Sequence, residues 1–167
     1  MIENDAPEGE DLAGLIALDP RQKSVLRVRS LLGGLIPLIM LTIGDFVLNH
    51  EFDFPGGWIA SAGVLLYILT VLILPSRRYQ RWGYRQSGRA IRIASGLIIR
   101  RETIVPYDRV QHIDVSRGPI ERAFGVATLT LHTAGSYNST VDLPGLAIDD
   151  ANRMRDEIRS YISEDLA

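Results

Sequence analysis

The sequence predicts an α+β membrane protein: a two-span transmembrane helical hairpin, followed by a bent antiparallel β-barrel that a C-terminal helix caps. Three observations support this fold class. Two long apolar runs come early in the chain, at residues 31–48 and 58–74. Short segments with the alternation of half-buried strands follow them. The chain then ends in a segment whose apolar residues recur every three to four positions, which is typical of an amphipathic helix.

The composition excludes several classes of site. The chain has 167 residues, about one domain with an appendage. It has no cysteine, which excludes disulfides, thiolate zinc sites, iron–sulfur clusters and cysteine nucleophiles. Its net charge is −2, so we expect no nucleic-acid partner. Residues 1–20 carry six acidic side chains and no basic one, and we expect them to form an acidic, disordered tail.

Both apolar runs are long enough to cross a bilayer. As helices they would measure roughly 25–27 Å, close to the hydrocarbon thickness of about 30 Å. We therefore predict a membrane hairpin at residues 21–78, with spans at about 31–48 and 58–74. Two buried helices of a soluble protein are disfavoured, because so small a chain has little protein to cover them. A signal peptide is disfavoured because an acidic segment precedes the first run and a second run follows it.

The charges around the hairpin predict its orientation. The linker between the spans contains Glu51 and Asp53 and no lysine or arginine, whereas both outer flanks are basic. By the positive-inside rule, both termini then lie in the cytoplasm. The basic residues are Arg21, Lys23, Arg27 and Arg29 before the first span, and Arg77, Arg78, Arg81 and Arg85 after the second.

Asp45 is the only charged residue within the two runs. An acidic residue inside a span is a functional candidate by default, because a charge in lipid is costly. Asp45 also lies three residues before Leu48, at the end of its run, so its carboxylate could extend to the outer headgroups. We favour the second interpretation.

Residues 79–167 predict a compact domain of six or seven antiparallel strands followed by one helix. Within the strand "ATLTLHT", Ala127, Leu129 and Leu131 share one face, and threonines and a histidine share the other. Turns are predicted at Ser87–Gly88, Pro106–Asp108, Gly118–Pro119, Phe124–Gly125 and Gly135–Asn138.

The terminal helix is predicted from an apolar stripe that runs from Ile148 to Ile162. Asp149 and Asp150 stand at its start, where carboxylates offset the free N–H groups and the helix dipole. We expect this helix to cover one open end of the bent sheet.

The stretch "TIVPYDRVQHIDVSRGPIERAFGVATLTLHTAG", residues 103–135, carries an ordered set of short motifs. It resembles the core of the bacterial pleckstrin-homology-like membrane proteins, the YdbS/YdbT-like group. The resemblance extends from Leu18 to Ile162, and departs from the family at Pro119–Glu121, where apolar residues are more usual. The matching positions are Pro106, Tyr107, Arg109, Val110, Gln111, Gly118, Arg122, Phe124, Gly125, Thr133, Ala134, Gly135, Gly145, Leu146 and Ala151.

This resemblance implies a cytoplasmic pleckstrin-homology-like domain at residues 79–167, anchored in the bacterial plasma (inner) membrane. The family-motif residues then have structural roles, since a fold fixes shape more firmly than function. We expect Phe124 to plug the barrel and Arg122 to clamp a turn by donating to carbonyl groups. The positions to which we assign structural roles are Pro106, Arg109, Gln111, Gly118, Arg122, Phe124, Gly125 and Gly135.

Catalytic and metal sites are disfavoured. His112, Asp114 and His132 form the one set that resembles metal ligands, and a further ligand at proper spacing is missing. No nucleophile motif and no phosphate-binding glycine loop is present. We therefore expect no enzymatic activity, no metal and no cofactor, and interpret the histidines as solvated strand residues.

Three functional hypotheses remain. The first is a non-enzymatic module that docks a protein partner, possibly a larger membrane protein of the same family. The second is a sensor of anionic membrane lipids through Arg77, Arg78, Arg81 and Arg85, each worth about 1 kcal/mol near the surface; these arginines could equally serve only to set topology. Arg100–Arg101 could extend that patch, although a solvated strand face with Glu102 is favoured. The weakest is an enzyme or transport accessory that uses Asp45 or the histidines.

Overall fold

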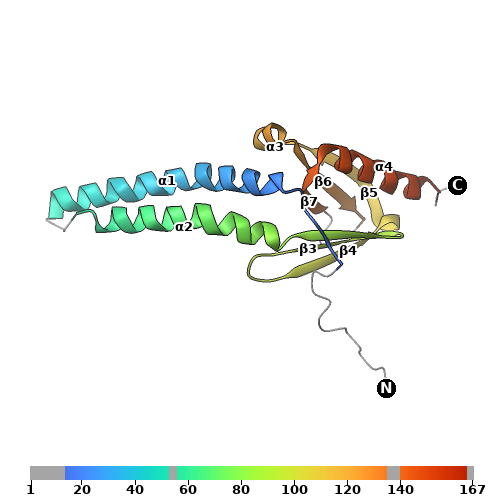
Figure 1. Ribbon diagram of the computed structural model, residues 1–167, viewed down its shortest axis with the longest axis horizontal. Helices are drawn as coiled ribbons and strands as arrows, with labels where there is room; N and C mark the ends of the chain where they lie inside the picture. The colour runs from blue at the N-terminus through green and yellow to red at the C-terminus, as the bar shows by residue number, and fades with distance from the viewer. Residues whose placement is uncertain (1–13, 53–55, 135–139, 165–167) are drawn as a thin grey trace, which may run out of the picture.

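The computed structural model describes residues 14–52, 56–134 and 140–164. A long helical hairpin projects from one side of a compact β domain (Figure 1). The elements are β1 (Ile16–Ala17), α1 (Arg21–Phe52), α2 (Trp58–Gln80), β2 (Gly83–Ser87), β3 (Ala90–Ser95), β4 (Arg101–Pro106), the 3-10 helix η1 (Tyr107–Arg109), β5 (Val110–Ser116), α3 (Pro119–Phe124), β6 (Val126–Thr133), β7 (Thr140–Ala147) and α4 (Ile148–Glu164). Most of the predicted acidic tail and the predicted turn at 135–138 lie outside the described residues.

The helices α1 and α2 are long and apolar enough to cross a membrane. In their most apolar windows only 6% and 11% of the residues are buried, so neither is the covered core helix of a soluble protein. Side chains such as Ile36, 71% exposed, face outward along the pair, as lipid-facing side chains do. A Cβ on Gly34 would lie 2.5 Å from the Tyr67 ring, so this glycine lets the two helices approach closely.

Asp45 caps the start of α2 from the neighbouring helix. Its carboxylate accepts hydrogen bonds from the Gly57 N–H (2.7 Å) and the Ile59 N–H (3.1 Å), and Asp45 is only 6% exposed. The favoured prediction that it extends to the headgroups is therefore wrong. Gly57 has no side chain to cap its own helix, so free amides at the turn attract the carboxylate of α1 instead.

Replacing Asp45 with alanine should destabilise the hairpin by about 1–2 kcal/mol, because the first turn of α2 loses its acceptor. Asp45→Asn keeps one acceptor oxygen and should lose about half as much. Thr42→Ala is the control, since the Thr42 hydroxyl donates only to the Leu38 carbonyl of its own helix. Thermal unfolding in detergent, followed by Trp58 fluorescence in a Trp82→Phe background, measures the effect. Equal melting temperatures for Asp45→Ala and Thr42→Ala would contradict the capping role.

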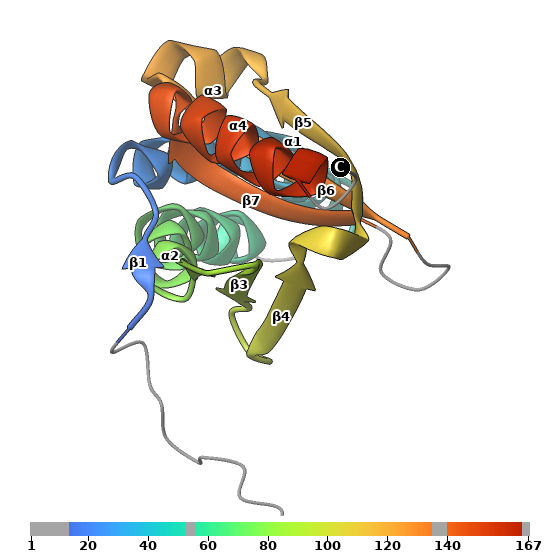
Figure 2. The ribbon, with the colours of Figure 1, turned by 90° about the vertical axis from the view of Figure 1, so that its right-hand side faces the viewer.

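The β domain contains two antiparallel sheets, with strand orders β1-β2-β3-β4 and β5-β6-β7. The predicted strands and terminal helix are confirmed, but the sheets are not closed into a barrel: within the described residues no pairing joins β4 to β5. The helical turn η1 carries the chain from one sheet to the other, which interrupts the ladder. Figure 2 shows α4 lying across the three-stranded sheet.

The core lies between the two sheets and α4. Ala127, Leu129 and Leu131 of β6 are all fully buried, as the alternation predicts. The stripe of α4 supplies Ala151, Met154 and Ile158 to the same cluster. Its other members are Leu18, Tyr84, Ile91, Ile93, Val105, Tyr107, Val110, Leu143 and Leu146.

Strand β1 belongs to the same domain although it precedes the hairpin. Ile16 pairs with Tyr84 and Ala17 with Gly83, and Leu18 is 3% exposed in the core. The Tyr79 hydroxyl donates to the Leu18 carbonyl at 2.7 Å, which ties the end of α2 to the segment before α1. These residues fell within the tail predicted at 1–20, and the structure places them in the sheet and the core.

Candidate functional site

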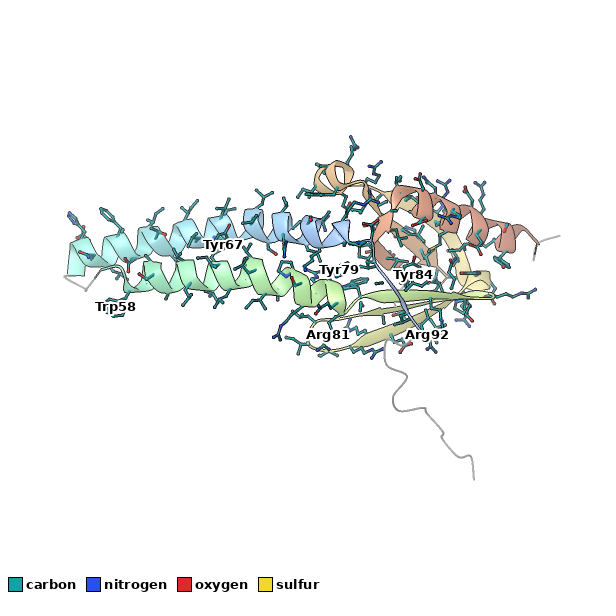
Figure 3. All side chains as sticks on the ribbon, viewed as in Figure 1. Trp58, Tyr67, Tyr79, Arg81, Tyr84 and Arg92 are labelled. Atoms are coloured by element: carbon teal, nitrogen blue, oxygen red, sulfur yellow. The ribbon has the colours of Figure 1, made fainter. Side chains whose placement is uncertain are left out.

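Two of the predicted headgroup arginines line a hollow where α2 meets the β domain. Arg77 lies in the last turns of α2 and Arg81 directly follows the helix. Together with Leu74, Gln80, Leu97 and Ile98 they line an open hollow of about 530 Å³. Figure 3 shows Arg81 at the end of α2, beside the β3–β4 hairpin. One wall of this hollow is therefore cationic and the other is aliphatic.

The remaining two arginines are placed differently. Arg78 is exposed and does not line the hollow. Arg85 lies on β2 opposite Arg92 of β3, and its guanidinium would meet a Cβ on Gly14 at 2.6 Å. Arg85 thus lies against the segment before α1. The predicted cluster of four is divided into a pair at the hollow and a pair outside it.

The aliphatic wall comes from the β3–β4 loop, residues 96–100. Gly96 has φ +121°, and a Cβ there would lie 1.9 Å from the Ile99 carbonyl oxygen, so the tight loop requires glycine. This reversal presents Ile98 and Ile99, which are 91% and 72% exposed. The loop was not predicted, because the imperfect alternation of "LIIRRETIVP", residues 97–106, indicates a half-buried strand. The signal was an aliphatic trio between a glycine and two arginines.

Arg100 ends the loop and Arg101 begins β4, and both are exposed. The favoured prediction placed them with Glu102 on a solvated strand face, and Arg101 and Glu102 are indeed both exposed on β4. The Glu102 carboxylate accepts from the Arg92 guanidinium, at 2.9 Å. The two arginines therefore lie directly after the exposed Ile98 and Ile99, while Glu102 pairs with Arg92 of the neighbouring strand β3.

A buried glutamate joins the hairpin to the domain. Glu121 of α3 is 5% exposed and accepts from the Gly118 N–H at 2.7 Å and the Thr128 hydroxyl at 3.2 Å. The Arg29 guanidinium, near the start of α1, completes the set at 3.1 Å. This glutamate is one of the residues that depart from the family pattern, and it fixes α1 to α3 and β6.

A second polar contact orders the start of α1. The Asp19 carboxylate accepts from the Arg21 backbone N–H at 2.8 Å and from its guanidinium at 2.8 and 3.0 Å. The side-chain hydrogen bond with Arg21 lowers the pKa of Asp19. The stabilisation by this carboxylate is therefore present at neutral pH and is lost only as the pH falls through that lowered pKa.

The family-motif turn is built differently from its prediction. Gly118 and Gly125 flank a short helix, α3, and Gly125 closes it at φ +70°, where glycine is favoured. Phe124 is only half-buried and does not plug the core, because it ends α3 at the rim of the domain. The Arg122 side chain is exposed and does not clamp the turn. Its backbone carbonyl instead accepts a hydrogen bond from the Arg117 guanidinium.

The other motif residues have structural positions. Pro106 ends β4, and the Arg109 carbonyl accepts from the Ala134 N–H at 2.9 Å. Gln111 is exposed on β5, and Gly135 lies outside the described residues. Tyr107, between Pro106 and Arg109, is 2% exposed, and its burial raises the pKa of the phenol.

The two histidines and Asp114 do lie together. Asp114 contacts His112 Nε2 at 2.9 Å and His132 Nε2 at 3.2 Å. All three side chains are at least 39% exposed. Among the described residues there is no group of metal-ligating side chains that could hold a metal ion, and the trio is a solvated surface feature.

Comparison with known proteins identifies the family. Residues 31–162 match the bacterial PH domain family. The chain is 34% identical over 123 residues to the UPF0699 transmembrane protein YdbS of Bacillus subtilis (strain 168), covering 72% of this chain and 76% of that protein. It is 24% identical over 111 residues to the UPF0699 transmembrane protein YdbT of the same organism, covering 66% of this chain and 22% of that longer protein. No solved structure matches the chain. With its two apolar helices and its domain of antiparallel sheets and a terminal helix, this membrane protein belongs to the bacterial PH domain family.

Proposed function

We propose that the protein is a non-enzymatic, membrane-anchored module that binds anionic lipid headgroups through Arg77 and Arg81. The hollow that these arginines share with Leu74, Leu97 and Ile98 carries this proposal. A phospholipid has a phosphate beside an aliphatic region, and the two walls of the hollow match those two parts. Guanidinium groups suit phosphate because they can donate two parallel hydrogen bonds.

The position of the hollow agrees with this ligand. Arg77 comes three residues after Leu74, the last residue of the apolar run, which is a rise of about 4.5 Å. The hollow therefore opens at the level expected for headgroups. The basic flanks of the hairpin favour the cytoplasmic leaflet of the plasma membrane, where anionic lipids attract juxtamembrane arginines.

Neutralising both lining arginines, Arg77→Gln with Arg81→Gln, should weaken binding of phosphatidylglycerol roughly 30-fold, because each arginine contributes about 1 kcal/mol of binding free energy. Native mass spectrometry of the full chain, titrated with phosphatidylglycerol and phosphatidylcholine in detergent, measures the binding. The matched control is Arg78→Gln with Arg85→Gln, which makes the same change in charge outside the hollow. Protease accessibility in membrane vesicles verifies that both variants keep their orientation. Equal losses in the two double variants would contradict a specific site.

The open sheets support a second candidate, docking of a protein partner. The strands β4 and β5 each end a sheet within the described residues, and such an edge can accept an added strand. Ile104 of β4 is 56% exposed beside that edge. The partner would be another membrane protein of the family. Photo-crosslinking from position 104 in intact membranes tests this candidate, and only a single, saturable adduct supports it.

A further inference from the structure

We propose that the β3–β4 loop inserts its tip, Leu97–Ile99, into the lipid leaflet on the domain's side. The domain would then contact the bilayer at a third point, beyond the two helices of the hairpin. This inference goes further than headgroup binding, because it concerns the aliphatic tip and requires no anionic lipid.

The tip lies level with the end of the apolar span. Leu97 and Ile98 line the same hollow as Leu74, and Leu74 is the last residue of the apolar run of α2. In Figure 1 the turn between β3 and β4 lies on the side of the domain from which the hairpin projects. A bilayer that surrounds α2 up to Leu74 therefore also meets the loop tip.

Among the described residues of the β domain, the tip has the most exposed large aliphatic side chains. Ile98 and Ile99 are 91% and 72% exposed, whereas Ile16 of β1 and Ile104 of β4 reach 55% and 56%. Moving such side chains out of water is favourable. The exposed Arg100 and Arg101 follow them. Aliphatic residues with basic residues next to them are typical of segments that bind at a membrane surface.

The loop cannot easily turn away from the bilayer. Its shape is preset by Gly96, whose backbone contacts the Ile99 carbonyl too closely for any side chain. The domain that carries the loop is fixed to α1 through Glu121 and Arg29 and to α2 through the Tyr79 hydroxyl. Both helices thus hold the tip at one depth, and insertion needs no rearrangement of the domain.

The absence of cysteine makes the test direct. Ile98→Cys in the full chain accepts a single environment-sensitive fluorophore such as NBD, and the protein is reconstituted in phosphatidylcholine liposomes with and without phosphatidylglycerol. Ile104→Cys is the matched control, an exposed isoleucine of β4 about 10 Å beyond the start of that strand. We expect lipids with a doxyl group near the headgroup to quench the label at 98 at least threefold more than the label at 104. Aqueous iodide should show the reverse order.

Two outcomes would overturn insertion. Equal quenching of both labels by iodide would place the tip in water. Protection of position 98 from both quenchers would mean that a partner protein or a second copy covers the loop. Insertion in phosphatidylcholine alone would support this inference even if the Arg77 and Arg81 substitutions left lipid binding unchanged, so the two proposals can fail separately.

Discussion

Replacing Glu121 with alanine is expected to lower the free energy of unfolding of the β domain by about 2–4 kcal/mol. The substitution removes the acceptor of the Gly118 N–H and of the Thr128 hydroxyl. Both hydrogen bonds are only part-buried, so each loss falls in the lower half of the about 1–3 kcal/mol that an unsatisfied buried donor costs. It also leaves Arg29 without its carboxylate partner. Because Arg29 is half exposed, water can solvate it, which keeps the loss below that of a fully buried pair.

The control for this prediction is Glu102→Ala. Glu102 forms an ion pair with Arg92 in which both side chains are about 40% exposed, and such surface pairs contribute about 0–1 kcal/mol. Urea unfolding in detergent, followed by Trp82 fluorescence in a Trp58→Phe background, reports on the domain because Trp82 packs against its core. If both alanine variants shift the midpoint equally, the three-way contact at Glu121 does not stabilise the junction.

The substitution Gly145→Ala should destabilise the domain by about 2–5 kcal/mol. Gly145 has φ +75°, and a Cβ there would lie 2.5 Å from Cγ of Gln22. Left-handed backbone costs a non-glycine residue about 1–2 kcal/mol, and overpacking about 1–3 kcal/mol more. Gln22 is 2% exposed at the start of α1, so it has no free space into which to move.

Two variants separate those costs. Gly88→Ala has the same backbone problem, at φ +53°, and meets no atom within 4 Å, so it should lose only the backbone part. In the double variant Gln22→Ala with Gly145→Ala, the steric part should be recovered, which a double-mutant cycle of unfolding midpoints measures. Additive losses in that cycle would mean that Gln22 and Gly145 do not contact each other in solution.

Sequence reasoning worked where a pattern extends over enough residues. The two spans follow from predominantly apolar runs of 18 and 17 residues, and the buried face of β6 follows from strict alternation. The strand β1 and the helix α3 have two and six residues, too few to show a period. Gly118–Pro119 was interpreted as a turn, whereas proline also suits the first position of a helix.

The candidate site was predicted only in part, because its walls come from distant segments. Arg77 and Arg81 were identified from their place after the second span. The loop tip was not, since aliphatic residues ordinarily indicate a covered strand, and only the structure shows that Ile98 and Ile99 are exposed in a loop beside Leu74. Glu121 looked like a departure from a family motif, and its partner Arg29 lies 92 positions away.

The pairing of β1 with β2 has a consequence for biogenesis. A ribosome makes Ile16–Ala17 first, yet their neighbours Gly83–Tyr84 emerge only after both helices. The sheet of the β domain can be completed only when the two ends of the hairpin lie on the same face of the bilayer. In a nascent chain whose second helix failed to integrate, β1 would stay unpaired and Leu18 would stay exposed. Such a chain would be open to cleavage by proteases.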